Sequence, residues 1–269
     1  MDAAFFQLNL SPQIHWGRGS ARNSVDKIRG WGRRVLLVHG GSFQRIEWLN
    51  DALIEQELLV ERFVCAQEPT LDLVEQGSKI ARDFSAEVVV AIGGGAVIDC
   101  AKGIAGLAPA SGPLLDYLEV VGKGKTLEAT PLPLIALPTT AGTGAEATAN
   151  AVIGVPAAQR KVSLRDRRLL PQLAAIDPSL TDGCPTDVTL ASGLDAISQV
   201  IEPYVSCRAN RFSDALCRSA IPVGLGALQS LMQQETQAAR DDMAWCSYCG
   251  GVALANAGLG AVHGLAGPL

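Results

Sequence analysis

Four short apolar runs, each ended by glycine or proline, constrain the fold more than any other feature of this sequence. They cover residues 34–38, 87–92, 133–137 and 173–176. Within these runs apolar and polar residues do not alternate regularly, as expected for strands buried on both faces. Because helix-like segments separate the runs, the sequence predicts an α/β fold with a doubly wound parallel sheet.

The pattern changes from about residue 186 onward, where alanine, leucine, serine and cysteine recur at helical spacing. Proline-containing dipeptides at 177–178 and 184–185 punctuate the chain just before this change. We therefore predict an α/β domain over residues 1–180, followed by an all-helical domain over residues 181–269.

Composition narrows the function classes. The 269 residues are 48% hydrophobic, with a net charge of -5 and 5% aromatic residues, so no nucleic-acid partner is expected. The first ten residues lack the basic start of a secretory signal, and no apolar run suggests a membrane span. The odd number of cysteines, seven, favours reduced thiols. We expect a cytoplasmic protein without a membrane partner.

A triple glycine follows the second apolar run. Gly93, Gly94 and Gly95 precede a segment with helical spacing, and without Cβ atoms they let a pyrophosphate approach the backbone closely. The N–H groups and dipole of the following helix favour an anion there. The same triplet also fits a turn that only closes a tight βα connection, and its spacing is not GxGxxG.

A loop rich in threonine follows the third run. Thr139, Thr140 and Thr143 accompany two glycines within residues 137–146. Hydroxyls and bare N–H groups suit ribose and phosphate oxygens. A helix N-cap would account for one threonine but not for three, so this loop favours a nucleotide site.

Longer motifs carry a resemblance to a known family. Residues 93–102, GGGAVIDCAK, resemble the GGGSxxDxAK stretch of iron-containing (group III) alcohol dehydrogenases, with Ala96 where that family usually has serine. Residues 138–146, PTTAGTGAE, are similar to its PTTAGTGSE. Further similar segments follow in the family's order, namely 175–178, 193–196, 201–204, and Asn256-Ala257 with His263.

The resemblance implies a nicotinamide dinucleotide, NAD or NADP, in a cleft between the two domains. The implied cofactor-binding residues are Gly93, Gly94, Gly95 and Ala96 at the pyrophosphate and Asp99, Thr139, Thr140 and Thr143 on the ribose and nicotinamide side. Lys161 is a further candidate, with a solvated lysine as the alternative.

The turn after the first run bears on NAD versus NADP. An acidic residue there would bind the adenine ribose hydroxyls and repel a 2′-phosphate. This sequence has Gly40, Gly41 and Ser42 instead, which resembles the NADP-using members of the family. We expect a slight preference for NADP, although a turn with no role in cofactor binding could have the same residues.

The family holds a divalent metal, iron or zinc, with one aspartate and three histidines. By resemblance the metal residues here are Asp195 and His263, with Gln199 where a histidine is usual. A glutamine carbonyl is a poor replacement for imidazole, and the sequence ends at Leu269 before the last histidine of the pattern. We expect weak metal binding, with Asp195 as a helix-capping or buried carboxylate if no metal binds.

The resemblance thus implies a metal-assisted oxidoreductase that interconverts an alcohol and an aldehyde or ketone. We expect an incomplete helical domain, truncated at the C-terminus, a small-molecule partner and a homo-oligomer as one possibility. The sequence assigns no catalytic side chain and no particular substrate. Alternatives are a dehydroquinate-synthase-like lyase, a polyol-phosphate dehydrogenase of the same fold, and a non-catalytic nucleotide-binding remnant.

Overall fold

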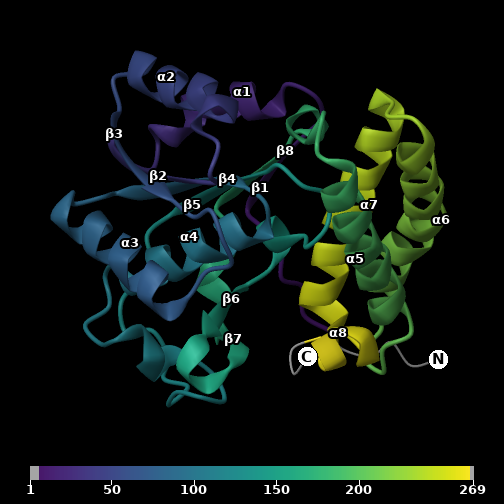
Figure 1. The fold of residues 1–269 in the computed structure, drawn as a ribbon. Coiled ribbons are helices and arrows are strands. Elements are labelled where there is room, and N and C mark those ends of the chain that lie inside the picture. The colour runs from purple at the N-terminus through teal and green to yellow at the C-terminus, as the bar shows by residue number, and fades with distance from the viewer. Residues whose placement is uncertain (1–5, 267–269) are drawn as a thin grey trace. The chain divides into compact units, whose positions relative to one another are not determined.

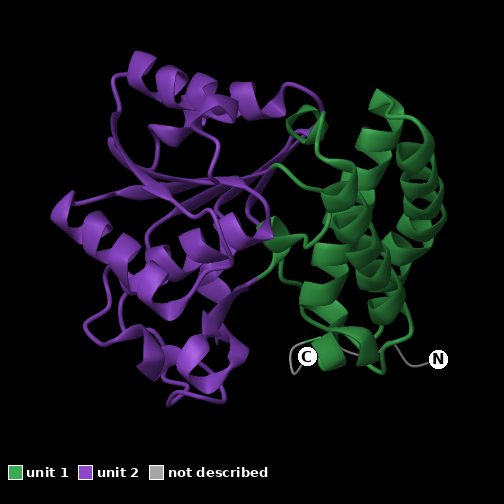
Figure 2. Ribbon diagram, in the orientation of Figure 1, with its two compact units in different colours: residues 1–10, 139–148, 178–269 green, residues 11–138, 149–177 purple. Residues whose placement is uncertain are grey.

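The computed structural model describes residues 6–266, and their contacts divide the chain into two compact units (Figure 2). The sheet unit comprises Ser11–Pro138 and Ala149–Asp177. The helical unit comprises Thr139–Thr148, the chain from Pro178 onward and the segment before Ser11. The threonine-rich loop, placed in the first domain by sequence, therefore packs with the helices. The domain boundary at residue 180 stays a prediction, because contacts describe packing and not independent folding.

Six parallel strands form the sheet, in the order β1-β8-β5-β4-β2-β3. Their bounds are β1 (Gln13–Trp16), β2 (Arg34–His39), β3 (Leu59–Val64), β4 (Val88–Gly93), β5 (Leu134–Pro138) and β8 (Leu173–Ile176). The four apolar runs of the sequence form the four central strands, which confirms the parallel α/β fold. The edge strands β1 and β3 escaped prediction because they are half exposed and carry polar residues.

Helices cover both faces of this sheet, with α1 and α2 on one side and α3 and α4 on the other (Figure 1). Their bounds are α1 (Ser20–Ile28), α2 (Glu47–Glu55), α3 (Leu71–Asp83) and α4 (Gly95–Leu107). A two-stranded antiparallel hairpin, β6 (Asn150–Val155) and β7 (Arg160–Arg165), packs against α4. Because α4 lies between the sheet and this hairpin, nearly all of its residues are buried.

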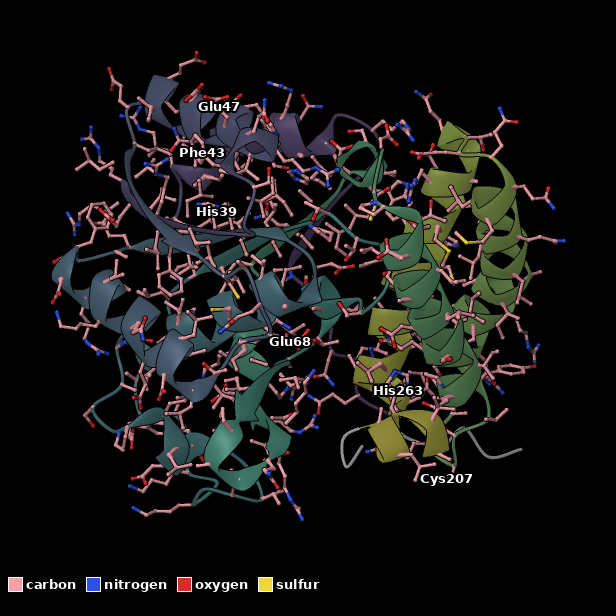
Figure 3. The ribbon with its side chains drawn as sticks, in the orientation of Figure 1. His39, Phe43, Glu47, Glu68, Cys207 and His263 are labelled. Carbon is pink, nitrogen blue, oxygen red and sulfur yellow. The ribbon has the colours of Figure 1, made fainter. Side chains whose placement is uncertain are left out.

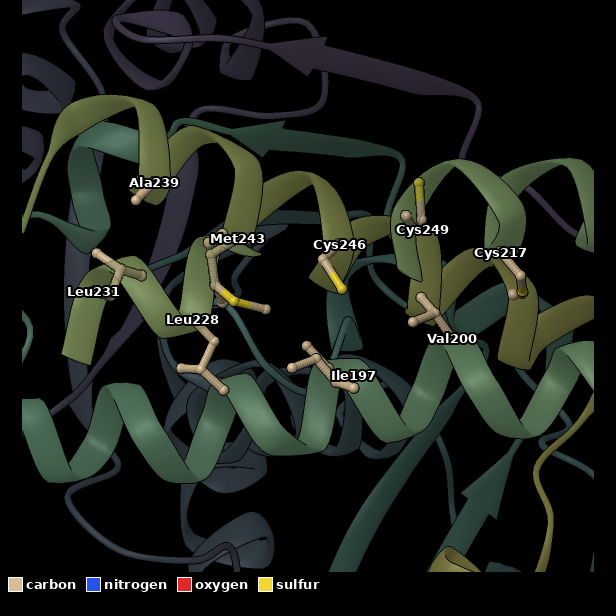
Figure 4. Close-up of a cluster of buried hydrophobic side chains, with 14 residues drawn as sticks. Ile197, Val200, Cys217, Leu228, Leu231, Ala239, Met243, Cys246 and Cys249 are labelled. Carbon is tan, nitrogen blue, oxygen red and sulfur yellow. The ribbon is translucent and has the colours of Figure 1, made fainter. Parts of the chain in front are cut away.

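Three long helices and one short helix build the helical unit. They are α5 (Thr186–Tyr204), α6 (Arg211–Gln233), α7 (Gln237–Ala257) and α8 (Ala261–Ala266). The first three enclose an apolar core, drawn in Figure 4, which contains Ile197, Val200, Leu228 and Met243. Cys246 and Cys249 are fully buried in this core, which agrees with packing roles. Asn210 begins α6 with a capping box.

Among the described residues, one helix is long and apolar enough to cross a membrane. It is α6, whereas no apolar run of that length is expected from the sequence. A single helix of this kind is weak evidence, because core helices pass the same test. Cys217, Ala220 and Leu228 on α6 face the apolar core, so packing accounts for part of its apolar character.

Candidate functional site

The triple glycine forms the junction of β4 and α4, at the carboxyl edge of the sheet. Gly93 ends β4, Gly94 is the N-cap with an extended backbone, and Gly95 is the first residue of α4. The first backbone N–H that bonds back into the turn is that of Val97, to the carbonyl of Gly94 at 3.0 Å. The N–H groups of Gly95 and Ala96 thus lie at the open helix start, where an anion can accept from them.

Glycine is required at residue 93, the first glycine of the triplet. A Cβ built on Gly93 would lie 2.5 Å from a methyl carbon of Val97. The same valine side chain lies 3.9 Å from a Cβ built on Gly40. The end of β2 and the start of α4 therefore meet over Val97, which brings two of the predicted cofactor-binding stretches together.

Asp99 and Lys102 form a charge pair on α4, in which the lysine is fully buried and the aspartate is 15% exposed. The Nζ atom of Lys102 lies 3.9 Å from Oδ1 of Asp99 and donates to the carbonyl of Asn150 at 2.9 Å, and the lysine side chain is 0% exposed. Oδ2 of Asp99 accepts from the N–H of Val152 at 3.1 Å. Burial raises the pKa of Asp99 to about 6, although Lys102 opposes the shift. The pair fastens β6 to the helix that begins at the glycine turn.

The turn after β2 is exposed and lacks a negative side chain. Gly41 and Ser42 are exposed. Phe43 follows, with the ring of His39 at 6.0 Å and the guanidinium of Arg62 at 4.5 Å from its own ring (Figure 3). Residues 40–42 thus carry no carboxylate, and the Arg62 guanidinium lies over the ring of the residue that follows them.

Lys161 lies on the hairpin, on β7. Its Nζ atom is 3.0 Å from a carboxylate oxygen of Glu68, and both side chains are more than half exposed. This surface ion pair agrees with the solvated-lysine alternative as far as the described residues go. A role at the cofactor stays a prediction.

The threonine-rich loop folds against α7 within the helical unit. Gly144 has φ 58°, and a Cβ on it would lie 2.5 Å from the Cα of Gly251. Two glycines are therefore needed for this backbone contact. The hydroxyl of Thr143 accepts from the N–H of Ala145 at 3.2 Å, which is a local turn contact, since the N-cap of the short helix that follows is Gly144. Thr139 and Thr140 make no hydrogen bond with other residues in the range 6–266.

The three predicted metal residues lie together in the helical unit. Nε2 of His263 is 3.0 Å from Oδ1 of Asp195, and Nε2 of Gln199 donates to Oδ2 of Asp195 at 3.0 Å. The same amide donates to the carbonyl of Gly142 at 3.0 Å. On the other side of the imidazole, Nδ1 of His263 is 2.5 Å from Oε2 of Glu202. Figure 3 shows His263 in α8.

Two carboxylates set the protonation of this cluster. Hydrogen bonds with Asp195 and, to a lesser extent, Glu202 raise the pKa of His263, although burial opposes the shift. Burial would raise the pKa of Glu202, but hydrogen bonds with His263 and with the N–H groups of Gly260 and Val262 outweigh it and lower that pKa. The arrangement favours the protonated form of the His263 imidazole and the ionised form of the Glu202 carboxylate.

Gln199 does not fit the role of a metal ligand. Both of its neighbours, the Asp195 carboxylate and the Gly142 carbonyl, are acceptors, so the amide nitrogen and not the oxygen faces them. Asp195 and His263 could still ligate, with Glu202 behind the imidazole as a supporting carboxylate. In the described part of the chain no group of three or more His, Cys, Asp and Glu side chains could hold a metal ion.

Two residues of this region were missed as functional candidates. Glu202 was quoted only as part of a motif, yet it lies seven residues after Asp195 and on the same helix face, a spacing that could have revealed it. Lys102 is only the last residue of the motif at 93–102, which does not indicate its burial. Its burial follows from the hairpin β6–β7, which the sequence did not predict.

Comparison with known proteins gives the family. The description "Iron-containing alcohol dehydrogenase" matches residues 11–178, and "Fe-containing alcohol dehydrogenase family, C-terminal" matches residues 189–269. The chain is 37% identical over 260 residues to alcohol dehydrogenase 4 of Schizosaccharomyces pombe, covering 93% of this chain and 60% of that protein. It is 40% identical over 264 residues to long-chain-alcohol dehydrogenase 1 of Geobacillus thermodenitrificans, covering 96% and 66%.

A solved structure agrees with this assignment. Sulfoacetaldehyde reductase from Bifidobacterium kashiwanohense, in complex with NAD+, matches with a TM-score of 0.87 and 26% identity, covering 97% of this chain and 70% of that chain. The chain thus spans about two thirds of the length of the relatives it matches. Two models of this family together match nearly all of the sequence. The chain therefore belongs to the iron-containing alcohol dehydrogenase family.

Proposed function

We propose that this protein is an oxidoreductase that interconverts an alcohol and an aldehyde or ketone with a nicotinamide dinucleotide. The observation that carries the proposal is the β4–α4 junction, where the N–H groups of Gly95 and Ala96 lie at an open helix start. Family membership supplies the reaction class. The dehydroquinate-synthase-like and polyol-phosphate alternatives lack the support of these family matches.

The β4–α4 junction would hold the pyrophosphate through backbone N–H groups, with no side chain required. Gly93 keeps the turn tight, and the charge pair of Asp99 and Lys102 holds the helix against β6. A helix start fixed in this way presents its dipole to the phosphate at no further ordering cost.

The test of dinucleotide binding is a fluorescence titration of the full chain with NADH and NADPH. Gly94→Val should abolish binding, because its side chain would occupy the place of the pyrophosphate. Gly226→Val is the matched control, since nothing lies within 4 Å of a Cβ at that position on α6. Equal affinity of the parent and the Gly94 variant would contradict the assignment.

We further propose that the chain binds NADPH at least as well as NADH. The turn at residues 40–42 has no carboxylate to repel a 2′-phosphate, and Arg62 lies against Phe43 beside it. Arg62→Glu should lower NADPH affinity more than NADH affinity. A preference of the parent for NADH by more than roughly tenfold would overturn this proposal.

Metal binding in this chain is proposed to be weak. The family is iron-containing, but Asp195 and His263 are two ligands, and the amide of Gln199 turns its donor toward the site. Three protein ligands are usual in catalytic metal sites. Metal analysis after dialysis should find well under one tightly held iron or zinc per chain, and Gln199→His should raise retention. Stoichiometric metal in the parent would show that a ligand was missed.

Nucleotide binding without turnover is a second candidate, and the Gln199 amide, which turns its donor toward Asp195, favours it. Alcohol-dependent reduction of NAD and NADP, assayed with added iron or zinc, separates the two. Turnover on the order of 1 per second or more would support the oxidoreductase. A cytoplasmic location and a homo-oligomer remain parts of the proposal that cell fractionation and light scattering would test.

A further inference from the structure

Two buried thiols meet at the carboxyl edge of the sheet. Cys65 directly follows β3, and its N–H donates to the carbonyl of His39 at 2.8 Å. The sulfur of Cys65 lies 3.7 Å from the carbonyl oxygen of Ala96, and the thiol of Cys100 is the side-chain partner that most affects the pKa of Cys65. Ala96 is one turn before Cys100 on α4, and helical side chains lean toward the preceding turn. The geometry of the helix therefore aims Cys100 at Cys65.

The two thiols differ in acidity. The hydrogen bond with Cys100 lowers the pKa of Cys65, with burial opposing it and the backbone of Gln67 assisting. The same hydrogen bond, together with burial, raises the pKa of Cys100. The thiolate is the reactive form of cysteine, so Cys65 is the nucleophile of the two.

Cys65 is also nearer to solvent. Although both side chains are buried, the residues around Cys65 are exposed, namely Val64, Ala66, Gln67 and Glu68 (Glu68 in Figure 3). Val64 ends β3, an edge strand, and the other three residues follow it, so local opening of this exposed segment would uncover Cys65. Cys100 lies beneath Cys65 on a helix that is almost wholly buried.

We propose that Cys65 and Cys100 are a redox modification site at which a peroxide forms a reversible disulfide. The sulfur of Cys65 attacks one peroxide oxygen, the O–O bond breaks, and the departing oxygen leaves as water with the proton of Cys65. The sulfur of Cys100 then displaces the hydroxyl of the resulting sulfenic acid, which leaves as water with the proton of Cys100. Two thiols lose two electrons, and one peroxide becomes two waters.

The disulfide would change the first turn of α4. An S–S bond of about 2.05 Å is shorter than any contact between two thiols, so the two sulfurs must draw together at the first turns of α4. Ala96, whose carbonyl contacts Cys65, belongs to the predicted pyrophosphate turn. Weaker dinucleotide binding in the oxidised protein follows, and this consequence rests on the proposed function.

The experiment treats the reduced full chain with hydrogen peroxide, alkylates the remaining thiols and analyses tryptic peptides by mass spectrometry. Residues 63–79 and 83–102 form separate tryptic peptides with one cysteine each. We expect a cross-link of these two peptides that dithiothreitol removes. Cys207 is exposed, so its oxidation shows that the peroxide is active. Recovery of both peptides with free thiols while Cys207 is oxidised would overturn the proposal.

Variants separate this pair from the other buried thiols. Cys65→Ser and Cys65→Ala should abolish the cross-link, whereas Cys246→Ser, in the helical core, should retain it. Thermal melting of each variant checks that it is folded. A cross-linked 83–102 peptide in a folded Cys65 variant would contradict the assigned partner.

A separate titration tests the coupling to dinucleotide binding. Oxidation should weaken NADH binding by at least roughly fivefold, the lower end of typical couplings between sites. Equal affinity of the reduced and cross-linked chains would overturn the coupling. Failure of both forms to bind would instead overturn the proposed function, since the cross-link is detected without any cofactor.

Discussion

In each of the two units, a helical aspartate contacts a polar side chain one turn further along the same helix. The two sites differ in the elements that supply their other partners. In the sheet unit, Asp99 lies beside Lys102, and both side chains bond to the backbone of the neighbouring strand β6. In the helical unit, Asp195 lies beside Gln199 and is 34% exposed. Its further partner, His263, comes from the six-residue helix α8.

The difference shows that the spacing of two polar residues along a helix does not by itself decide how much they contribute to the stability of the fold. Lys102 is fully buried, and Asp99 and the carbonyl of Asn150 stabilise its charge. The Asp195 cluster depends on Glu202, which is buried and bonds to α8. We therefore expect substitutions at the Asp99 site to lower the stability of the whole fold. Substitutions at the Asp195 site should mainly destabilise α8.

The largest effect is expected for Lys102→Met. The variant leaves the Asp99 carboxylate buried without its cation, which should lower the free energy of unfolding by about 3 kcal/mol. The double variant with Asp99→Asn should recover most of the loss, because no unpaired charge remains. Urea-induced unfolding followed by circular dichroism measures both. If Lys102→Met were as stable as the parent, the Asp99 site would not contribute more to the stability of the fold than the Asp195 site.

Gly251→Ala should be the next most damaging change. Its Cβ would lie 2.3 Å from the carbonyl oxygen of Gly144, and backbone cannot shift as a side chain can. We expect a loss of about 1–3 kcal/mol in thermal unfolding. Gly226→Ala, with nothing within 4 Å, is the control and should stabilise α6 by roughly 0.4–1 kcal/mol. Similar results for both glycines would contradict a backbone contact.

The pH dependence of stability should reveal Asp99. Its pKa is about 6 in the folded chain and 3.8 in the reference state, so the folded state binds more protons between these values. The free energy of unfolding should therefore fall, by on the order of 2 kcal/mol, as pH rises from about 4 to 6. Denaturant titrations across this range should show the fall in the parent and not in Asp99→Asn.

Glu202→Gln is expected to act locally. The carboxylate accepts from the N–H of Val262 at 2.6 Å and bonds His263, so its loss frees α8 from α5. Hydrogen-exchange protection in residues 261–266 should drop by about 1–2 kcal/mol, while β4 amides keep theirs. Equal loss of protection in both places would show that the two units are not energetically distinct.

The smallest effect is expected at Glu235. Hydrogen bonds with Arg240, assisted by the N–H of Gly183, lower its pKa to about 2, from an ordinary 4.5. The stabilisation is present above about 4.5 and is lost as pH falls toward 2. The side chain is 42% exposed, so solvent screening limits the gain to well under about 1 kcal/mol. Glu235→Gln should flatten this acid limb of the stability curve.

Much of the sheet unit followed from the sequence by itself. Runs of apolar residues without polar alternation predicted β2, β4, β5 and β8, because central strands of a parallel sheet are buried on both faces. Glycine at residues 93–95 predicted the β4–α4 turn, because only glycine leaves the backbone open to a phosphate. The longer motifs around these features were sufficient to indicate the family.

Other features depend on contacts between distant segments, which periodicity cannot report. The half-exposed edge strands, the packing of the threonine-rich loop with α7 and the meeting of Cys65 with Cys100 are of this kind. The orientation of Gln199 is another, since the carbonyl of Gly142, 57 residues away, makes its amide a donor. The sequence determines which side chains are available for a site. The hydrogen-bond donors and acceptors around each side chain decide its chemistry, and only the tertiary structure brings these partners together.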